Sequence, residues 1–424
     1  MLFKKPRGIR LERKKISSLL NTLKRPYAPK QVLLPLYGGP AAELTPYFKI
    51  GEHVQVGQKI AAPQTADGVP VYASLSGKIE KTATVLLPNG QKCLAVEITG
   101  DTDPASSQFV ETKKEIEGFT QEDLLGIFQE RGLLTTDEKM EPVHVKAKKN
   151  ATARTVVINC SEPEPYITSG QMLFTLNPIE ILKGAELLRK AVGAEKAVMV
   201  IEDANREEYE LIKSKIYLSK WETIKTKIIP TVYPAGREDF LLKDFQGDVV
   251  VWDVATAYAV YEAVYLQKPF YERVVTVAGE CIVEPRNLWL PFGFFFQDAI
   301  QSCKGFLRDP RKVLAGGPMT GTAQETLDVP VTAGTNAILA LPPVVARESH
   351  EQPCIRCNRC VDTCPVSLSP AMITIAAEHA EFEIAERRGA MDCVECGVCN
   401  YVCPSERPMA TLLRLAKEKI RSRR

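Results

Sequence analysis

Apolar and polar positions divide the chain into regions with different repeats. Between residues 30 and 100, short runs with a two-residue period alternate with Gly and Pro turn signals, which predicts a small all-β unit. Between residues 155 and 279, apolar runs typical of buried strands alternate with amphipathic helical segments, which predicts a parallel sheet of Rossmann-like class. Residues 273–345 are strand-rich again, whereas residues 370–389 have apolar positions at helical spacing. The pattern therefore predicts a multidomain α/β protein.

The all-β unit contains two short motifs that resemble a known fold. The pattern G-E-x-V-x-V-G-Q-x-I runs from Gly51 to Ile60, and A-S-L-S-G-K-I follows from Ala73 to Ile79. Both are similar to the barrel-sandwich hybrid fold of biotinyl and lipoyl carriers, which present a lysine for the prosthetic group. No lysine occurs in residues 62–72, between the motifs. We therefore expect a scaffold or docking module and not a carrier.

Two cysteine motifs near the carboxyl end carry the strongest chemical signal. Each reads C-x2-C-x2-C-x3-C-P, and together they extend from Cys354 to Pro404. This spacing is typical of loops that hold a [4Fe-4S] cluster with three thiolates, while the fourth Cys ligates the other cluster. The predicted ligands are Cys354, Cys357, Cys360 and Cys403 for one cluster, and Cys393, Cys396, Cys399 and Cys364 for the second.

Structural zinc sites are the alternative for these motifs, because C-x2-C is also a zinc spacing. Zinc takes four ligands at each site, and it explains neither the third Cys of each motif nor the Pro that follows the fourth. The motifs therefore favour two iron–sulfur clusters, and two linked clusters predict a protein that carries single electrons.

Composition and charge narrow the class of protein further. The chain has 424 residues and 45% apolar content, enough for two to four domains with buried cores. A formal net charge of +2 gives no sign of a nucleic-acid surface. The cysteines outside the motifs, Cys93, Cys160, Cys281 and Cys303, are spread singly, which is typical of reduced thiols. We therefore expect a protein of a reducing compartment.

Neither the start of the chain nor its apolar segments predict membrane insertion. Residues 1–15 are basic and polar, unlike a secretory leader. The most hydrophobic stretch, residues 249–266, contains Asp253 and Glu262, so no run of about 18 apolar residues occurs. We expect a cytoplasmic protein that at most docks peripherally on the inner face of the cell membrane.

The combination of segments along the chain resembles one family. The segments are, in chain order, VLLPLYGGPA, GEHVQVGQKI, VINCSEPEPYI (157–167), VYPAGREDFLL (232–242), VATAYAVYEAVYLQKPFYERVVTVAG (254–279) and LAGGPMTG (314–321). With the twin cysteine motifs, they make the chain similar to the RnfC family along nearly its whole length. RnfC proteins are peripheral iron–sulfur subunits of the ion-pumping Rnf electron-transport complex. The resemblance implies an FMN site on the Rossmann-like domain, with NADH as hydride donor and the clusters as the exit for single electrons.

One segment departs from the family pattern. The family carries a glycine-rich loop, G-x-x-G-x-G-G-A-G-F-P-T-H-V-K, where this chain has GLLTTDEKMEPVHVK from Gly132 to Lys146. The inner glycines are replaced by Thr135, Asp137, Glu138 and Met140. Glycines let backbone N–H groups approach a phosphate closely, whereas these side chains block the approach and the two carboxylates repel the anion. We therefore predict that FMN and NADH binding is lost and that the domain is retained as a scaffold.

Three residues remain candidates for a flavin-type pocket. Asn159, Glu162 and Glu164 match the positions that line the flavin and nicotinamide region in the family. The same residues are equally explained as a turn after a strand, whose path Pro163 and Pro165 restrict. Both interpretations stay open.

The sequence leaves two main classes of function open and a third that is less favoured. The first is an adaptor that relays single electrons between redox partner proteins without its own FMN or NADH site, similar to the RnfC-like proteins associated with D-proline reductase. The second is an NADH:acceptor oxidoreductase subunit of an Rnf-type ion-translocating membrane complex, with FMN held by a remodelled loop. The third is a cobalamin-reducing relative, since that group shares the RnfC plan. Flavin content separates the first class from the other two.

Four domains are expected from these segments. Residues 1–100 form a barrel-sandwich hybrid scaffold, and residues 101–270 a Rossmann-like α/β domain with a degenerate FMN/NADH-type site. Residues 271–345 form a small β-grasp-like domain, and residues 346–424 an α-helical ferredoxin domain with two [4Fe-4S] clusters.

Overall fold

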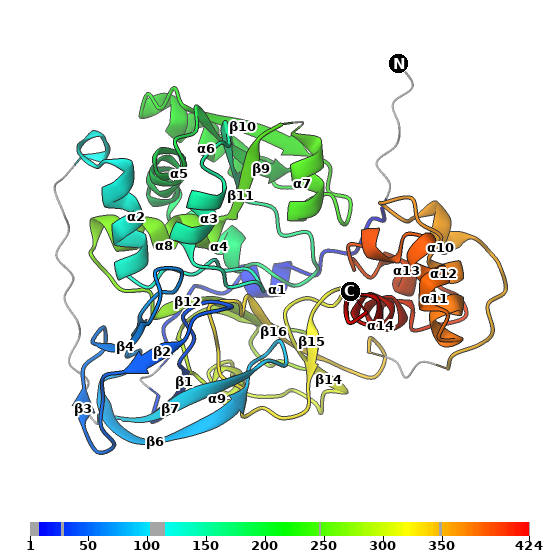
Figure 1. Cartoon of the computed structure of the whole chain (residues 1–424), viewed down its shortest axis with the longest axis horizontal. Coiled ribbons are helices and arrows are strands. Elements are labelled where there is room, and N and C mark those ends of the chain that lie inside the picture. The colour runs from blue at the N-terminus through cyan, green and yellow to red at the C-terminus, as the bar shows by residue number, and fades with distance from the viewer. Residues whose placement is uncertain (1–7, 27–28, 102–114, 246, 347–349, 424) are drawn as a thin grey trace.

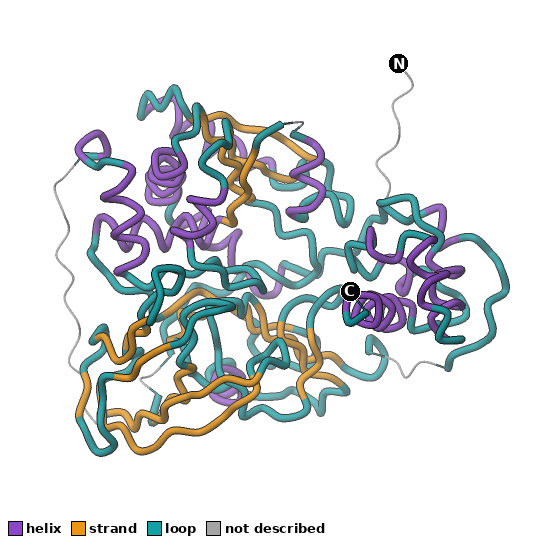
Figure 2. Tube along the Cα trace, viewed as in Figure 1, coloured by secondary structure: helices purple, strands orange, loops and turns teal. Residues whose placement is uncertain are grey.

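The computed structural model describes residues 8–26, 29–101, 115–245, 247–346 and 350–423. This part of the chain contains four β-sheets and a helical unit at the carboxyl end (Figure 1). In the view of Figure 1, an α/β unit lies above two β units, and the helical unit lies to one side of them. Figure 2 shows the same division: helices and strands are mixed in the α/β unit, helices make up the carboxyl-terminal unit, and strands predominate in the lower units.

The amino-terminal β unit consists of two small antiparallel sheets, with orders β1-β7-β6-β3 and β2-β4-β5. Alternate apolar residues such as Val32, Ile79 and Ile98 are fully buried in the core of this unit. The all-β prediction for this region is therefore confirmed. The strands are β1 (Gln31–Pro35), β2 (Leu44–Pro46), β3 (His53–Val54), β4 (Lys59–Pro63), β5 (Val71–Tyr72), β6 (Gly77–Leu86) and β7 (Lys92–Gly100).

Four parallel strands form the sheet of the α/β unit, in the order β10-β9-β8-β11. The strands are β8 (Thr155–Asn159), β9 (Lys196–Glu202), β10 (Ile224–Ile229) and β11 (Val249–Asp253). The helices are α2 (Gln121–Glu130), α3 (Val143–Lys149), α4 (Ser169–Leu176), α5 (Pro178–Val192), α6 (Arg206–Leu218), α7 (Glu238–Asp244) and α8 (Val254–Tyr265), preceded by the 3-10 turn η1 (Ile116–Gly118). Helices α5 and α8 lie so close together that a Cβ on Gly184 would overlap the carbonyl oxygen of Ala257. Strands alternate with helices as the sequence predicts.

The strand predicted at residues 273–279 does not continue this parallel sheet, to which its alternation with helices had assigned it, and belongs instead to the strand-rich region of residues 273–345. It is β12 (Glu272–Ala278), in a separate five-stranded sheet of order β13-β12-β16-β14-β15. Every residue of β12 is buried. Strands of a parallel sheet that is covered on both faces are buried in the same way. The apolar sequence of β12 therefore does not reveal which sheet the strand joins. The other elements of this unit are β13 (Arg286–Pro291), α9 (Phe296–Gln301), β14 (Lys312–Ala315), β15 (Thr322–Gln324) and β16 (Ala337–Leu341).

The helical unit at the carboxyl end carries both cysteine motifs. The helical spacer predicted at residues 370–389 is divided into two helices, because Ala380 adopts a left-handed conformation with φ 57°. Both helices pack against α14, which supplies the buried residues Leu413 and Ala416. The helices are α10 (Arg359–Asp362), α11 (Pro370–Glu378), α12 (Phe382–Arg387), α13 (Val398–Tyr401) and α14 (Met409–Arg421), with the 3-10 turn η2 (Ala390–Asp392). No helix in the described ranges combines the length and apolar character needed to cross a membrane.

The amino-terminal segment, residues 8–26, connects the units. Ile9 and Tyr233 exchange two backbone hydrogen bonds of 2.9 and 2.8 Å, at the edge of the α/β unit. Further along, α1 (Ile16–Leu19) lies against β12 and β13, and the backbone N–H of Trp289 donates to the Lys24 carbonyl at 2.9 Å. The segment therefore contacts both the α/β unit and the five-stranded sheet.

A buried ion network joins α8 of the α/β unit to β12 of the five-stranded sheet, and it allows a test of the packing between the α/β unit and this sheet. Lys268 Nζ lies 2.6 Å from Glu262 Oε1 and 2.7 Å from Glu272 Oε1, and Arg25 also pairs with Glu272. Replacing Lys268 by Met leaves the buried Glu262 carboxylate without its cation and Glu272 with Arg25 alone, so we expect the free energy of unfolding to fall by about 3–5 kcal/mol. Urea denaturation followed by circular dichroism measures this change.

The matched control is Lys149→Met, which breaks the exposed ion pair between Lys149 and Glu141. An exposed pair is worth at most about 1 kcal/mol, so this variant is expected to unfold near the wild-type midpoint. Equal midpoints for the Lys268 and Lys149 variants would contradict a structural role for the buried network.

Candidate functional site

A cavity of about 340 Å³ opens at the carboxyl ends of β8 and β11. Residues 315–317, at the end of β14, and residues 320–322, at the start of β15, line it from the five-stranded sheet. In α/β proteins with parallel sheets, ligands bind in the crevice at the carboxyl ends of the strands. The cavity, called the central cavity below, is therefore the first candidate site.

Acidic side chains outnumber basic ones around the central cavity. Those that line it are Asp137, Glu138, Glu162, Glu164, Glu238, Asp239 and Asp253, against Lys139, Arg237 and Arg273. The buried Arg273 guanidinium donates from Nη1 to the carbonyl oxygen of Thr136 at 2.8 Å and also to that of Ala333. Burial lowers the pKa of Arg273 to about 10, against the raising effect of nearby carboxylates. The walls therefore carry more negative than positive charge, which opposes binding of an anion.

Asn159, one of the three candidate pocket residues, lies at the end of β8 and lines the cavity. Its Nδ2 donates to the carbonyl oxygen of Gly236 at 2.8 Å. Its Oδ1 accepts from the backbone N–H and the hydroxyl of Ser161, at 3.1 and 2.5 Å. Both ends of the amide are thus engaged in holding the turn after the strand.

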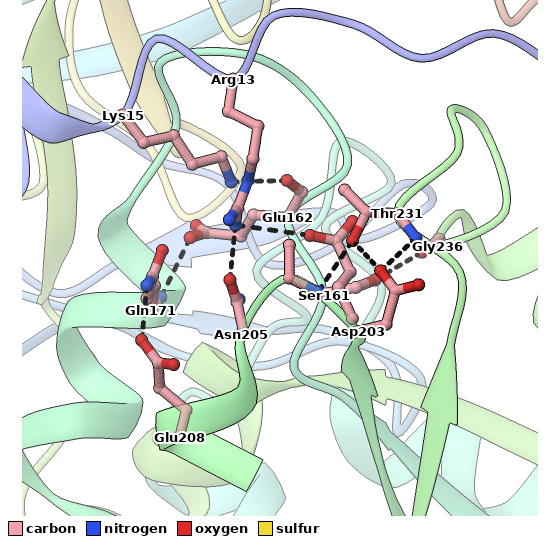
Figure 3. Close-up of polar contacts among 12 residues, drawn as sticks. Arg13, Lys15, Ser161, Glu162, Gln171, Asp203, Asn205, Glu208, Thr231 and Gly236 are labelled. Atoms are coloured by element: carbon pink, nitrogen blue, oxygen red, sulfur yellow. Dashed lines mark hydrogen bonds and ion pairs between the residues drawn. The ribbon is translucent and has the colours of Figure 1, made fainter.

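Glu162 also lines the cavity, but its carboxylate serves the start of α4 (Figure 3). It accepts from the backbone N–H of Gly170 at 2.7 Å and from that of Gln171 at 3.0 Å. Lys15, from the amino-terminal segment, donates its Nζ to the Glu162 carbonyl at 2.6 Å. The position of Glu162 is therefore determined by groups from two other segments, the start of α4 and the amino-terminal segment, since a carboxylate at a helix amino terminus satisfies free N–H groups there.

Glu164 connects the α/β unit to the five-stranded sheet. Its carboxylate accepts from the backbone N–H of Met319 at 2.8 Å and from the hydroxyl of Thr320. Burial raises the pKa of Glu164, while these hydrogen bonds oppose the shift. A Cβ on Gly317 would overlap this carboxylate, so the close approach requires glycine there. All three candidate residues line one cavity, and the side chain of each is hydrogen-bonded to the protein.

In the loop from Gly132 to Lys146, backbone N–H groups donate to a carboxylate of the loop itself, that of Asp137. Asp137 Oδ1 accepts from the backbone N–H groups of Lys139 at 3.0 Å and Met140 at 3.3 Å, and from the Thr135 hydroxyl at 2.7 Å. The N–H of Thr136 donates to Thr256 Oγ1 at 3.0 Å. Burial raises the pKa of Asp137, and Lys146 opposes the shift. The N–H groups available for a phosphate in a glycine-rich loop are thus occupied by side chains here.

A second carboxylate, which the sequence analysis did not identify as part of the site, lies beside the first. Asp253 ends β11 and caps α8, accepting from the backbone N–H of Thr256 at 2.6 Å and from the Thr136 hydroxyl. The signal in the sequence was an Asp directly before an apolar helix with Thr three positions later, which is typical of a helix N-cap. The Asp253 carboxylate therefore occupies the amino terminus of α8. In other proteins, the amino terminus of a helix that follows a parallel strand binds phosphate.

These contacts test whether the cavity fits an FMN phosphate. Two carboxylates, Asp137 and Asp253, occupy the donors, and Met140 adopts φ 45° where the family pattern has glycine. Lys146, which the family pattern retains, is paired with Glu238 at 3.0 Å. The loop and the start of α8 therefore do not fit the phosphate of FMN.

Four cysteines from the two motifs line one small cavity in the helical unit. They are Cys364, Cys393, Cys396 and Cys399, so one Cys of the first motif joins three of the second. The N–H of Leu368 lies 3.3 Å from Cys364 Sγ, and that of Glu395 lies 3.4 Å from Cys393 Sγ. Burial raises the pKa of the Cys399 thiol to about 12, so a metal that binds there displaces its proton. This set, called the inner set below, fits a [4Fe-4S] cluster by donor type and grouping.

The remaining motif cysteines form the outer set, Cys354, Cys357, Cys360 and Cys403, of which Cys357 is exposed. The loops of both motifs have the same backbone path, with left-handed residues two and four positions after the first Cys. These residues are Arg356 (φ 56°), Asn358 (φ 61°), Glu395 (φ 52°) and Gly397 (φ 74°). Such turns direct successive N–H groups toward a shared centre, which suits an anionic cluster.

Two further observations concern the cysteines and the other side chains that can bind metals. Among the described residues, no three Cys, His, Asp or Glu side chains converge on a single metal ion. The four cysteines outside the motifs are free thiols, as predicted, and Cys160, Cys281 and Cys303 are buried.

Three protein-family models match parts of this chain. Residues 3–103 match the RnfC barrel sandwich hybrid domain, residues 129–262 the Nuo51 FMN-binding domain, and residues 353–406 a 4Fe-4S dicluster domain. The predicted fold is therefore confirmed in outline: a multidomain α/β protein with an amino-terminal barrel-sandwich domain, a Nuo51-like central domain and a ferredoxin-type domain at the carboxyl end.

Curated proteins from several bacteria are similar along most of the chain. The C subunit of the proton-translocating ferredoxin:NAD(+) oxidoreductase complex of Clostridium ljungdahlii is 32% identical, covering 93% of this chain and 89% of its own length. The C subunit of the Na(+)-translocating complex of Acetobacterium woodii is 30% identical, covering 93% and 92%. The C subunit of the ion-translocating oxidoreductase complex of Rhodobacter capsulatus is 31% identical, covering 93% and 79%.

Among solved structures, a chain of an NAD+-reducing [NiFe]-hydrogenase in the H2-reduced state is similar in fold. The TM-score is 0.51 at 15% identity, and the match covers 73% of this chain and 62% of that chain. The comparisons as a whole favour the second predicted function, an Rnf-type oxidoreductase subunit, over the relay without FMN. The three bacterial relatives give no support to the branch associated with D-proline reductase.

Proposed function

The chain belongs to the RnfC family, and on this premise we propose that it is the peripheral electron-transfer subunit of an Rnf-type ion-translocating oxidoreductase complex. The observation that carries the proposal is the pair of cysteine sets in a 4Fe-4S dicluster domain. When bound, [4Fe-4S] clusters take up and release single electrons. The residues of this chain hold and orient them.

We assign the inner set, Cys364, Cys393, Cys396 and Cys399, to one cluster and the outer set, Cys354, Cys357, Cys360 and Cys403, to the other. The inner set is buried against α14, through residues such as Leu413 that line the same cavity. The N–H groups of Leu368 and Glu395 point at its sulfurs, and such bonds stabilise the extra electron of a reduced cluster.

The surface around the outer set is where we place the redox partner. Ile355 lies between two ligands of this set and is 67% exposed. An exposed apolar side chain beside a cluster suits docking of a partner protein, because burial brings the cluster close to the partner's redox centre. The partners are other redox proteins or subunits of the membrane complex, with this chain attached peripherally on the cytoplasmic side of the membrane.

The two candidate forms of this function differ in their flavin content. The self-occupied loop around Asp137, with Asp253 beside it, supports a subunit that passes electrons between partners without FMN. The match of residues 129–262 to an FMN-binding domain, and relatives named as ferredoxin:NAD(+) oxidoreductase subunits, support a second form with FMN and NADH chemistry in the central cavity. The geometry of this chain favours the first form.

The domain limits belong to the same proposal. We place the scaffold in residues 1–100, the α/β domain in residues 101–270 and the ferredoxin domain in residues 346–424. For residues 271–345 we retain a small β-grasp-like domain, which the mixed five-stranded sheet supports.

A cofactor inventory on anaerobically purified protein tests the proposed function. We expect about eight irons and eight acid-labile sulfides per chain, because each cubane contributes four of each. We expect no zinc and no stoichiometric flavin. One FMN per chain with eight irons would select the second form, whereas protein that holds zinc and no sulfide would overturn the electron-transfer proposal itself.

A further inference from the structure

The loop that carries the inner set is fastened to the α/β unit by two side chains from one turn. Tyr233 donates its hydroxyl to the carbonyl oxygen of Cys396 at 2.7 Å, and this bond is buried. Arg237 donates from Nη2 to the carbonyl oxygen of Val394 at 3.1 Å. Both acceptors belong to residues 393–396, and Tyr233 packs in one hydrophobic cluster with Cys396 and Val398. The inner set is therefore the one in direct contact with the α/β unit.

Arg237 also lines the central cavity, so one guanidinium borders both the cavity and the cluster loop. Its side chain is only 21% exposed, and its Nε is buried without a partner among the described residues. The carboxylate paired with it, Asp239, lies at 3.6 Å and is 44% exposed, so the positive charge is only partly balanced.

The other charges that face the loop differ from Arg237. Lys417, from α14, donates to the Cys393 carbonyl at 2.9 Å, but its Nζ is paired with Glu395 at 2.6 Å. Arg414 pairs with the same carboxylate at 3.2 Å. These two cations share one acidic partner that belongs to the loop itself. Arg237 is the cation that the α/β unit contributes.

We propose that Arg237 is a positioning residue for the inner cluster, which holds the cluster loop against the α/β unit and raises the reduction potential of that cluster. A reduced cluster carries one more negative charge than an oxidised one, so a fixed positive charge at the loop stabilises the reduced form. Burial strengthens this effect, because the interaction is weakly screened by solvent. The outer cluster, on the exposed loop, is not affected by this charge to the same degree. Without the Arg237 charge, the inner cluster is harder to reduce.

This inference rests on the proposed function, and it is tested on the full-length protein with both clusters present. Reduction potentials are measured by redox titration followed by electron paramagnetic resonance for wild type, Arg237→Gln, Arg237→Lys and Asp239→Asn. We expect Arg237→Gln to move one of the two cluster signals to a more negative potential and leave the other in place. Arg237→Lys keeps the charge and is expected to restore most of the potential. Asp239→Asn removes the balancing carboxylate and is expected to move the same signal in the positive direction.

The matched control is Arg189→Gln. Arg189 is 20% exposed and donates to the Ala194 carbonyl at 2.6 Å, in α5 and away from both cysteine motifs. Both potentials are expected to be unchanged in that variant. If Arg237→Gln fails to retain eight irons, Asp239→Asn decides the question, because an unchanged potential in that variant overturns the proposal. Two intact clusters with unmoved potentials in Arg237→Gln also overturn it, whereas missing iron in the wild type contradicts the proposed function instead.

Discussion

Replacing Cys357 by Ser is expected to remove one cluster and stop electron transfer through the chain, while the α/β unit stays folded. Cys357 is exposed at the outer set, and a serine hydroxyl is a poorer ligand for iron than a thiolate. Iron is expected to fall from about eight to about four per chain, since each cubane holds four irons. Iron and sulfide analysis, with electron paramagnetic resonance of the reduced protein, measures the loss, and dithionite-driven reduction of cytochrome c measures the transfer.

The α/β unit is expected to be unaffected because its core does not include the cysteine motifs. The buried residues of β8, β9, α5 and α8 pack with one another in a separate hydrophobic cluster. Circular dichroism and the thermal midpoint of the variant are therefore expected to remain close to the wild-type values. The control is Cys93→Ser, a free thiol outside the motifs, which is expected to keep all eight irons. Normal electron transfer in Cys357→Ser would show that the cluster assignment is wrong.

Restoring glycine to the loop is expected to strengthen FMN binding to the central cavity. The loop variant combines Thr135→Gly, Asp137→Gly, Glu138→Gly and Met140→Gly, which frees the N–H groups of Lys139 and Met140 and removes two carboxylates. Like charges about 4 Å apart near a protein surface repel by about 4 kcal/mol, so removing Asp137, which also frees the two N–H groups, is expected to tighten FMN binding about a thousandfold. Adding Asp253→Asn is expected to tighten binding further. Fluorescence quenching of added FMN measures the affinity.

The control for this prediction is Asp239→Asn. It removes a negative charge from the same cavity but leaves every bond of the Asp137 turn in place. We expect this variant to bind FMN no better than wild type, because the occupied N–H groups still exclude the phosphate. Wild-type protein that already carries one FMN per chain would contradict the reasoning. A correctly folded loop variant without measurable FMN binding would do so as well.

The sequence by itself determined the family, the iron–sulfur motifs and the order of the all-β, α/β and helical regions. These features depend on local spacing. A cluster loop needs its cysteines within a few residues of one another, and a strand or amphipathic helix shows its period within one element. The anomaly of the loop from Gly132 to Lys146 was also visible locally, because lost glycines and added carboxylates stand out in a single stretch.

Only the tertiary structure decided how these pieces act on one another. It showed that Asp137 and Asp253, 116 positions apart, line one cavity and accept backbone N–H groups there, and that Asn159, Glu162 and Glu164 hold turns and helix ends at the cavity. It also placed β12 in the second sheet and brought Arg237 to the cluster loop, 157 positions further along the chain. The physical reason is that hydrogen bonds and ion pairs between distant segments depend on the packing of whole units, and the period and spacing of a single segment carry no record of that packing.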